Sequence, residues 1–149
     1  MTRTSINIFL INLLSWFFVV SLFSNPASAS PEEDADKLRN LLSTGENLFQ
    51  LGQHDKAMKN FQQALTLSRK LKIVGAFALS LNNIGFVYET RGQYDKAIDN
   101  YQQVLAIAKR LGKEDQIAGF HFKIAAAYTS LKQYDKAIDN YQQVLAIAK

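Results

Sequence analysis

Residues 93–109 read QYDKAIDNYQQVLAIAK, and the same stretch recurs without one change at residues 133–149. A looser copy, QHDKAMKNFQQALTLSR, occupies residues 53–69, so the three copies follow one another at an offset of 40 residues. A fixed period of this length is typical of proteins that stack one supersecondary unit upon the next. The period therefore predicts a stacked array before any single residue is considered.

The repeated stretch has the apolar spacing of an α-helix, because its apolar residues recur three and four positions apart. In the middle copy these residues are Tyr94, Ala97, Ile98, Tyr101, Val104, Leu105, Ile107 and Ala108. On a helical wheel of ~100° per residue they cover roughly half the circumference, which is more than a helix with one buried side requires. We therefore expect this helix to have neighbours on two sides.

A second helix precedes the repeated stretch. In residues 77–91, a shared face carries Phe77, Leu81, Ile84 and Tyr88, and Gly85 on that face would let two helices approach closely. Gly92 is a natural end for this helix. The unit is therefore a helical hairpin, and it can bury the second side of its second helix only by stacking on the next hairpin.

The same reasoning predicts six helices and no strand. We expect helices near residues 34–51, 54–71, 76–91, 94–111, 115–131 and 134–148. Ser30 is placed to cap the first helix, with Glu33 in position for a capping box. Between the first and second hairpins Gly75 is the only clear helix breaker.

At these positions the chain resembles a tetratricopeptide repeat protein, in which a large apolar residue, Leu-Gly and an aromatic are followed by Ala, an aromatic and a small residue. The middle repeat matches at Leu81, Ile84, Gly85, Tyr88, Ala97 and Tyr101. The first repeat matches at Leu41, Gly45, Leu48, Ala57, Phe61 and Ala64. The third repeat matches at Ile124, Ala125, Tyr128, Ala137 and Tyr141. Departures from the pattern occur at Thr44, Val104, His121 and Val144.

The resemblance implies an all-α, right-handed solenoid of three stacked helical hairpins. The repeats would lie at about residues 38–71, 78–111 and 118–149, within a domain of residues 30–149. The 40-residue period is longer than the common 34, and it resembles the long-linker variety of the family.

Residues 1–29 differ from the rest of the chain. They combine Arg3 with a strongly apolar stretch at residues 6–23 and an Ala-Ser-Ala triplet at residues 27–29. Small residues in such a triplet are typical of a signal-peptide cleavage site. We expect a signal peptide that is cut after Ala29 and exports the repeats to the periplasm or the cell exterior. The alternative is an uncleaved membrane anchor, because ~18 apolar residues nearly span a bilayer.

The sequence offers little for catalysis. There is no cysteine, and the 17 basic and 13 acidic residues form no basic cluster interleaved with aromatics, so nucleic acid is not an expected partner. His54 and His121 occupy positions of the repeat pattern, and the pairs Asp95/Asp99 and Asp135/Asp139 lie on the polar side of their helices. We therefore predict no catalytic residue, no metal site, no cofactor and no small-molecule substrate.

The strongest candidate site is a surface. In proteins of the tetratricopeptide type, one face of the first helices lines a concave groove that holds peptides. By this resemblance the groove candidates are Leu42, Phe49, Leu79, Asn82, Phe86, Glu89 and Phe122. The alternative is that these apolar residues contact a neighbouring loop or are simply exposed.

The leading functional hypothesis is a non-catalytic scaffold that binds a peptide or helix of a partner protein in this groove. The alternative is the amino-terminal recognition part of a larger protein, with a catalytic or effector domain beyond Lys149. The apolar side of the last helix, residues 134–148, has no expected neighbour. We expect either a further hairpin beyond it or self-association through this helix.

Overall fold

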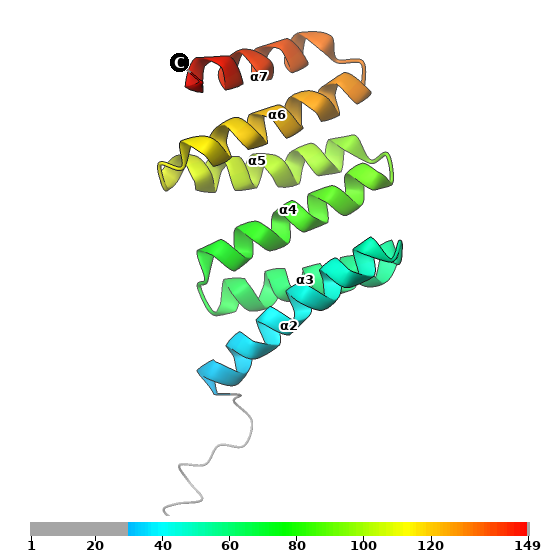
Figure 1. Cartoon of the computed structure of the whole chain (residues 1–149), viewed down its shortest axis with the longest axis vertical. Helices are drawn as coiled ribbons and strands as arrows, with labels where there is room; N and C mark the ends of the chain where they lie inside the picture. Colours follow the sequence, from blue (N-terminus) through cyan, green and yellow to red (C-terminus); the bar gives the residue numbers. More distant parts are fainter. Residues whose placement is uncertain (1–29, 149) are drawn as a thin grey trace, which may run out of the picture. The chain divides into compact units, whose positions relative to one another are not determined.

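The computed structural model describes residues 30–148 and contains six α-helices in that range, with no strand (Figure 1). The helices are α2 (Pro31–Gln50), α3 (His54–Lys70), α4 (Val74–Thr90), α5 (Tyr94–Arg110), α6 (Glu114–Ser130) and α7 (Tyr134–Ile147). All six predicted helices are present, and none of their ends differs by more than three residues from the prediction. The all-α solenoid predicted from the repeat is confirmed.

The predictions about residues 1–29 lie outside the described residues. The compact unit that carries the repeats begins at Asp34. Before it, the Glu33 N–H donates a hydrogen bond of 3.1 Å to Ser30 Oγ, which confirms Ser30 as the cap of α2. No helix between residues 30 and 148 is both long and apolar enough to cross a bilayer.

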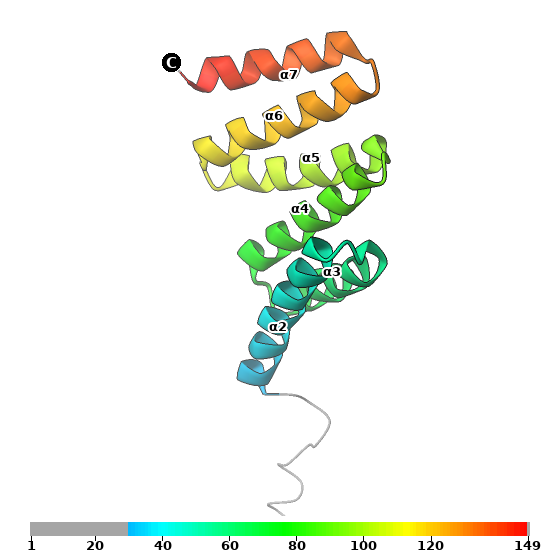
Figure 2. The same ribbon diagram turned by 45° about the vertical axis from the view of Figure 1, so that its right-hand side comes forward.

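Consecutive helices from α3 to α7 pack side by side, as two views of the ribbon show (Figure 2). Two apolar clusters hold them together, and each joins the second helix of one hairpin to the first helix of the next. The first cluster is Ala57, Met58 and Phe61 with Ile84 and Val87. The second is Ala97, Ile98, Tyr101, Leu105, Ile124 and Ala127. The core therefore lies between hairpins as well as within them, as the wide apolar side of the repeated helix requires.

Close contact within the hairpins depends on glycine. A Cβ atom on Gly85 would lie 2.5 Å from Cε1 of Tyr101, and one on Gly45 would lie 2.5 Å from Cε1 of Phe61. The expected close approach at Gly85 is confirmed. The third hairpin has Ala125 at the equivalent position, where the facing Tyr141 is only half-buried.

The turns correct one prediction. Gly75 does not break the helix, because α4 already begins at Val74. The chain turns at Lys72 instead, which adopts the left-handed conformation with φ 57°. The equivalent residue of the next repeat is Gly112, at φ 64°. The turn lies where the linker between the two helices was predicted, but lysine gave no signal that this residue would be left-handed.

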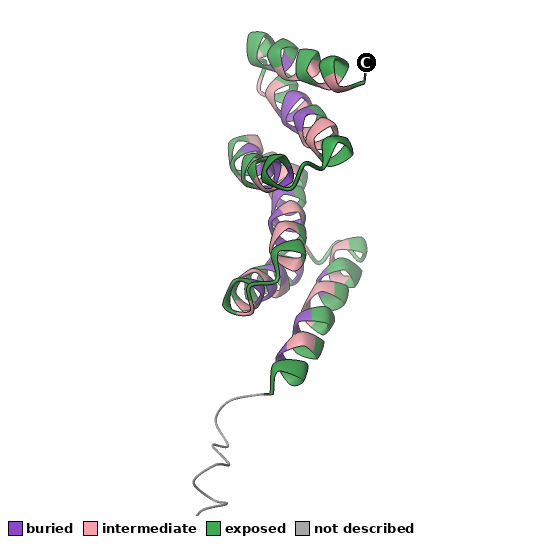
Figure 3. Ribbon diagram, turned by 90° about the vertical axis from the view of Figure 1, so that its left-hand side faces the viewer, coloured by how far each residue is buried: buried purple, intermediate pink, exposed green. Residues whose placement is uncertain are grey.

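The last helix has an open side. Each of the helices α3 to α6 has at least four buried residues, whereas α7 is mostly exposed (Figure 3). Three large apolar side chains of α7 reach solvent: Tyr134 is 58%, Ile138 53% and Leu145 65% exposed.

Candidate functional site

The predicted groove residues lie on the first helices of the three hairpins, α2, α4 and α6. Leu79, Phe86 and Phe122 are exposed despite their apolar side chains, with Phe122 at 55%. The other four are half-buried: Leu42, Phe49, Asn82 and Glu89. The sequence therefore predicted apolar and polar groups on an accessible surface. It did not predict the hollow and the hydrogen bonds that connect them.

A hollow of about 510 Å³ brings two of the predicted residues together. Phe49 of α2 and Phe86 of α4 both line it, with Phe61 of α3 among its walls. Glu46 and Asn83 supply polar groups to the same hollow. An apolar hollow with a few polar groups on its wall is the usual form of a recognition pocket.

A chain of hydrogen bonds crosses the three first helices. Lys123 Nζ of α6 donates to Asn82 Oδ1 of α4 at 2.9 Å, and Asn82 Nδ2 donates to Asn83 Oδ1 at 3.1 Å. Asn83 Nδ2 then donates to Glu46 Oε1 of α2 at 3.4 Å. This chain links polar side chains of α6, α4 and α2 along the surface that the first helices share.

The ammonium group of Lys123 also lies over aromatic rings of this surface. Its Nζ lies 3.9 Å from the centre of the Phe86 ring and 5.3 Å from those of Tyr101 and Phe120. Burial lowers the pKa of Lys123, and the attraction of the Glu89 carboxylate partly opposes that shift. The ammonium group is thus a partly desolvated cation whose interactions with a carboxylate or a carbonyl oxygen are stronger than those of a lysine in water.

Glu89 is engaged with the core. The Tyr101 hydroxyl donates a hydrogen bond of 2.6 Å to Glu89 Oε2. Burial raises the pKa of Tyr101, and the hydrogen bond and the negative charge of Glu89 raise it further. One carboxylate oxygen of Glu89 therefore holds the buried tyrosine in place, and the carboxylate links the groove surface to the core of the hairpin.

The remaining predicted residues lie apart from this cluster. Leu42 packs against the first apolar cluster beside Phe49. Phe122 packs edge-on against Tyr141 of α7, with ring centres 5.7 Å apart. Leu79 lies two turns from Phe86 on α4 and does not line the hollow. The structure thus joins Phe49, Asn82, Phe86 and Glu89, and leaves the other three as flanking apolar surface.

Sequence reasoning missed Lys123, Asn83 and Glu46 as members of the site. Asn83 and Lys123 occupy the same repeat position, 40 residues apart, and Ser43 is the first-repeat equivalent. This column lies next to the column of Leu42, Asn82 and Phe122. Comparing the columns would have revealed the polar row of Ser43, Asn83 and Lys123, whereas Glu46 lies in the column of Phe86 and Ala126.

The histidines lie in the repeat framework. His121 is buried, with Nδ1 2.9 Å from Asn140 Oδ1. His54 packs edge-on against Phe49, with ring centres 5.0 Å apart. Within residues 30–148, no group of three or more His, Asp or Glu side chains is arranged to hold a metal ion.

Comparison with known proteins places these observations in context. Two family models, both described as tetratricopeptide repeat, match residues 39–71 and 77–149. The crystal structure of the TPR domain of Arabidopsis FLU is similar over 76% of this chain and 95% of that one, with a TM-score of 0.70 and 29% sequence identity. No curated protein matches the chain.

Two more distant structures share the fold. Aspartyl phosphate phosphatase F from Bacillus subtilis matches with a TM-score of 0.69 and 22% identity, over 74% of this chain and 29% of that one. BtubC from P. vanneervenii matches with a TM-score of 0.70 and 21% identity, over 81% of this chain and 48% of that one. The chain therefore spans less than half the length of either of these two proteins.

Proposed function

Because the chain belongs to the tetratricopeptide repeat family, we propose that its repeats form a non-catalytic scaffold that binds a partner protein on the surface of α2, α4 and α6. The ligand of this surface is an extended peptide or a helix. The observation that carries the proposal is the hollow between Phe49 and Phe86, which adjoins the hydrogen-bonded chain from Lys123 to Glu46.

The chemistry of the surface suits a peptide. Phe49 and Phe86 offer apolar area to a side chain of the partner. The hydrogen-bonded amides of Asn82 and Asn83 supply polar groups beside this apolar area. Affinity would come from apolar contact, and orientation from the amides, as in other grooves that hold peptides.

A double variant tests the proposal. Asn82→Ala with Phe86→Glu removes the acceptor of Lys123 and places a carboxylate in the hollow. We expect partners captured by affinity pull-down with the wild-type chain, and identified by mass spectrometry, to be lost with this variant. Leu111→Glu is the matched control, because Leu111 is 52% exposed and lies in the turn after α5, outside the hollow. Equal capture by all three chains, with equal helical content by circular dichroism, would refute the groove.

We also propose that the scaffold works outside the cytoplasm. The support is the sequence of residues 1–29, with its apolar stretch and its Ala-Ser-Ala triplet. The mass of the mature amino terminus tests this proposal. A chain that starts at Ser30 supports export and cleavage, whereas a retained Met1 supports an anchor or a cytoplasmic protein.

A third proposal concerns self-association through α7. Its support is the exposed row of Tyr134, Ile138 and Leu145 on one helix. Sedimentation equilibrium should show a mass that rises with protein concentration, and Leu145→Lys should abolish that rise. A monomer at every concentration, with or without the substitution, would exclude it.

A further inference from the structure

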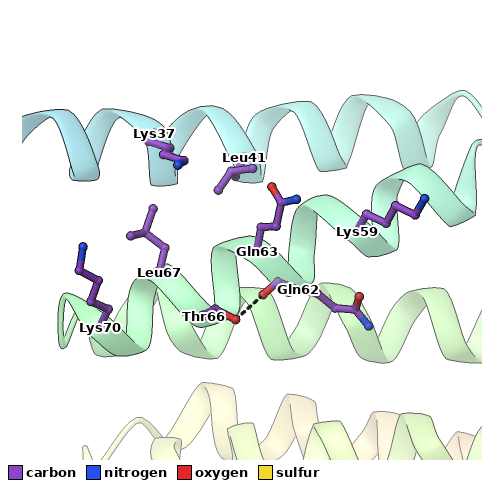
Figure 4. A pocket seen from close by; sticks show the side chains of 8 residues that line it. All are labelled: Lys37, Leu41, Lys59, Gln62, Gln63, Thr66, Leu67 and Lys70. Carbon is purple, nitrogen blue, oxygen red and sulfur yellow. Dashed lines mark hydrogen bonds between the residues drawn. The ribbon is translucent and has the colours of Figure 1, made fainter. Parts of the chain in front are cut away.

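A second hollow, separate from the groove, lies between α2 and α3 (Figure 4). Its volume is about 600 Å³, within the range of pockets that bind ligands. Leu41 of α2 and Leu67 of α3 both point into the space between the two helices. None of the residues that line it belongs to the groove.

The ionisable groups that line this hollow are all cations. Lys37 extends from α2, and Lys59 and Lys70 extend from α3. The remaining lining residues are apolar or carry amide and hydroxyl groups, and no carboxylate lines the hollow among the described residues. The hollow thus combines the apolar side chains of Leu41 and Leu67 with positive charges around them.

Neighbouring carboxylates neutralise only part of this charge. Asp34 pairs with Lys70, with Oδ2 and Nζ 2.9 Å apart. Asp36 pairs with Arg39 instead, at 2.6 Å. Within residues 30–148, the ion pairs formed include neither Lys37 nor Lys59. Two ammonium groups at the border of the hollow are therefore available to an external anion.

The repeat shows that the fold does not require these lysines. The residues equivalent to Lys59 in the second and third repeats are Asp99 and Asp139, and all three are exposed. Polar residues at the end of a solenoid improve its solubility, which accounts for Lys37 on the first helix. The first repeat therefore has a positive charge at an exposed position where the second and third repeats have a negative one.

We propose that the hollow between α2 and α3 is a second docking surface, and that its ligand is an acidic segment of a partner protein with apolar side chains between its carboxylates. The apolar side chains contact Leu41 and Leu67, while the carboxylates pair with Lys37 and Lys59. Charge complementarity selects an acidic partner and rejects a basic one. Binding weakens as salt is added, because the pairs are exposed.

Fluorescence anisotropy tests the proposal with the full chain and a short labelled peptide in which leucines alternate with pairs of glutamates. Lys59→Asp is the informative variant, because the second and third repeats already carry aspartate at this position and fold with it. We expect it to weaken binding about tenfold, since it replaces an attraction by a repulsion. Lys37→Gln should weaken binding to a smaller extent. Lys136→Asp, on the exposed surface of α7, makes the same change in net charge and should leave binding unchanged.

Three results would overturn the proposal. The first is absence of binding by the wild-type chain at low salt. The second is an equal loss with Lys59→Asp and Lys136→Asp, which would mean that net charge alone attracts the peptide. The third is equal binding of a peptide with lysine in place of glutamate. The double variant in the groove tests a different surface, so either proposal can fail while the other stands.

Discussion

Helices α5 and α7 begin with the same fourteen residues, YDKAIDNYQQVLAI, yet their side chains meet different surroundings. In α5, five of these fourteen residues are buried, because α4 and α6 pack on either side of it. In α7 only Ala137 is buried. Ile98 is 4% exposed, whereas its identical counterpart Ile138 is 53% exposed. The sequence of a repeat therefore determines that it forms a helix, and the next hairpin determines how much of that helix is buried.

The largest difference between the two helices should appear when the paired isoleucines are shortened. Ile98→Ala should lower the free energy of unfolding by about 3 kcal/mol, because it leaves a cavity between α5 and α6. Ile138→Ala should change it by less than about 0.5 kcal/mol, because water already reaches that side chain. Urea denaturation followed by circular dichroism measures both. Equal losses would mean that α7 is covered as completely as α5.

A smaller difference should separate the paired tyrosines. Tyr101 is fully buried and its hydroxyl donates to Glu89, whereas Tyr141 is half-buried. Tyr101→Phe should destabilise the fold by about 1.5 kcal/mol, because it leaves a carboxylate without its donor. Tyr141→Phe, measured in the same denaturation series, serves as the control and should have little effect. A larger destabilisation by Tyr141→Phe than by Tyr101→Phe would mean that the Tyr101–Glu89 hydrogen bond does not stabilise the core.

The same tyrosine predicts a pH dependence. Because the pKa of Tyr101 is raised in the folded chain, its contribution to stability is complete below its ordinary pKa of 10.0 and is lost as the pH rises above it. The loss is up to about 1.4 kcal/mol per pH unit. The lowered pKa of Lys123 acts in the opposite direction. The free energy of unfolding of the wild type should therefore exceed that of Tyr101→Phe by less at pH 11 than at neutral pH. An excess that does not change with pH would argue against the raised pKa of Tyr101.

The smallest effect concerns the turns that precede the two helices. The turn before α5 has Gly92 at φ 69°, whereas the turn before α7 has Lys132 at φ 59°. A left-handed conformation is strained for lysine and free of strain for glycine. Lys132→Gly should therefore stabilise the chain by about 0.5 kcal/mol, and Gly92→Lys should destabilise it by a similar amount. Thermal unfolding midpoints measure both, and a lower midpoint for Lys132→Gly would contradict the assigned turn.

The period and the apolar spacing predicted most of the fold. Residues that repeat every 40 positions predicted the six helices, their order and the contact at Gly85, because each hairpin packs on its neighbours in the same way. The turn between α3 and α4 lies in the predicted linker, but Lys72 was not predicted as its left-handed residue, because that conformation is set by the backbone hydrogen bonds of the turn: the N–H of Ile73 donates to the carbonyl of Ser68 at 2.9 Å. Lysine carries no local signal for such a turn.

The site was harder to predict than the fold. The spacing of Asn82, Phe86 and Glu89 placed them on one helix face. The bond from Lys123 to Asn82, by contrast, joins residues 41 positions apart on two helices. Such a contact depends on how far one hairpin is rotated against the next and on which rotamer a long side chain adopts. A single sequence specifies neither.

Amide hydrogen exchange of α5 and α7, followed by NMR on a dilute monomeric sample, tests most directly that stacking decides burial. The two helices share one sequence, so the intrinsic exchange rates of matching amides are equal, and any difference in protection comes from their surroundings. We predict that the amides of Ile98 to Leu105 exchange only through global unfolding, while those of Ile138 to Leu145 exchange through local opening and much faster. Equal protection in the two helices would contradict this account of the fold.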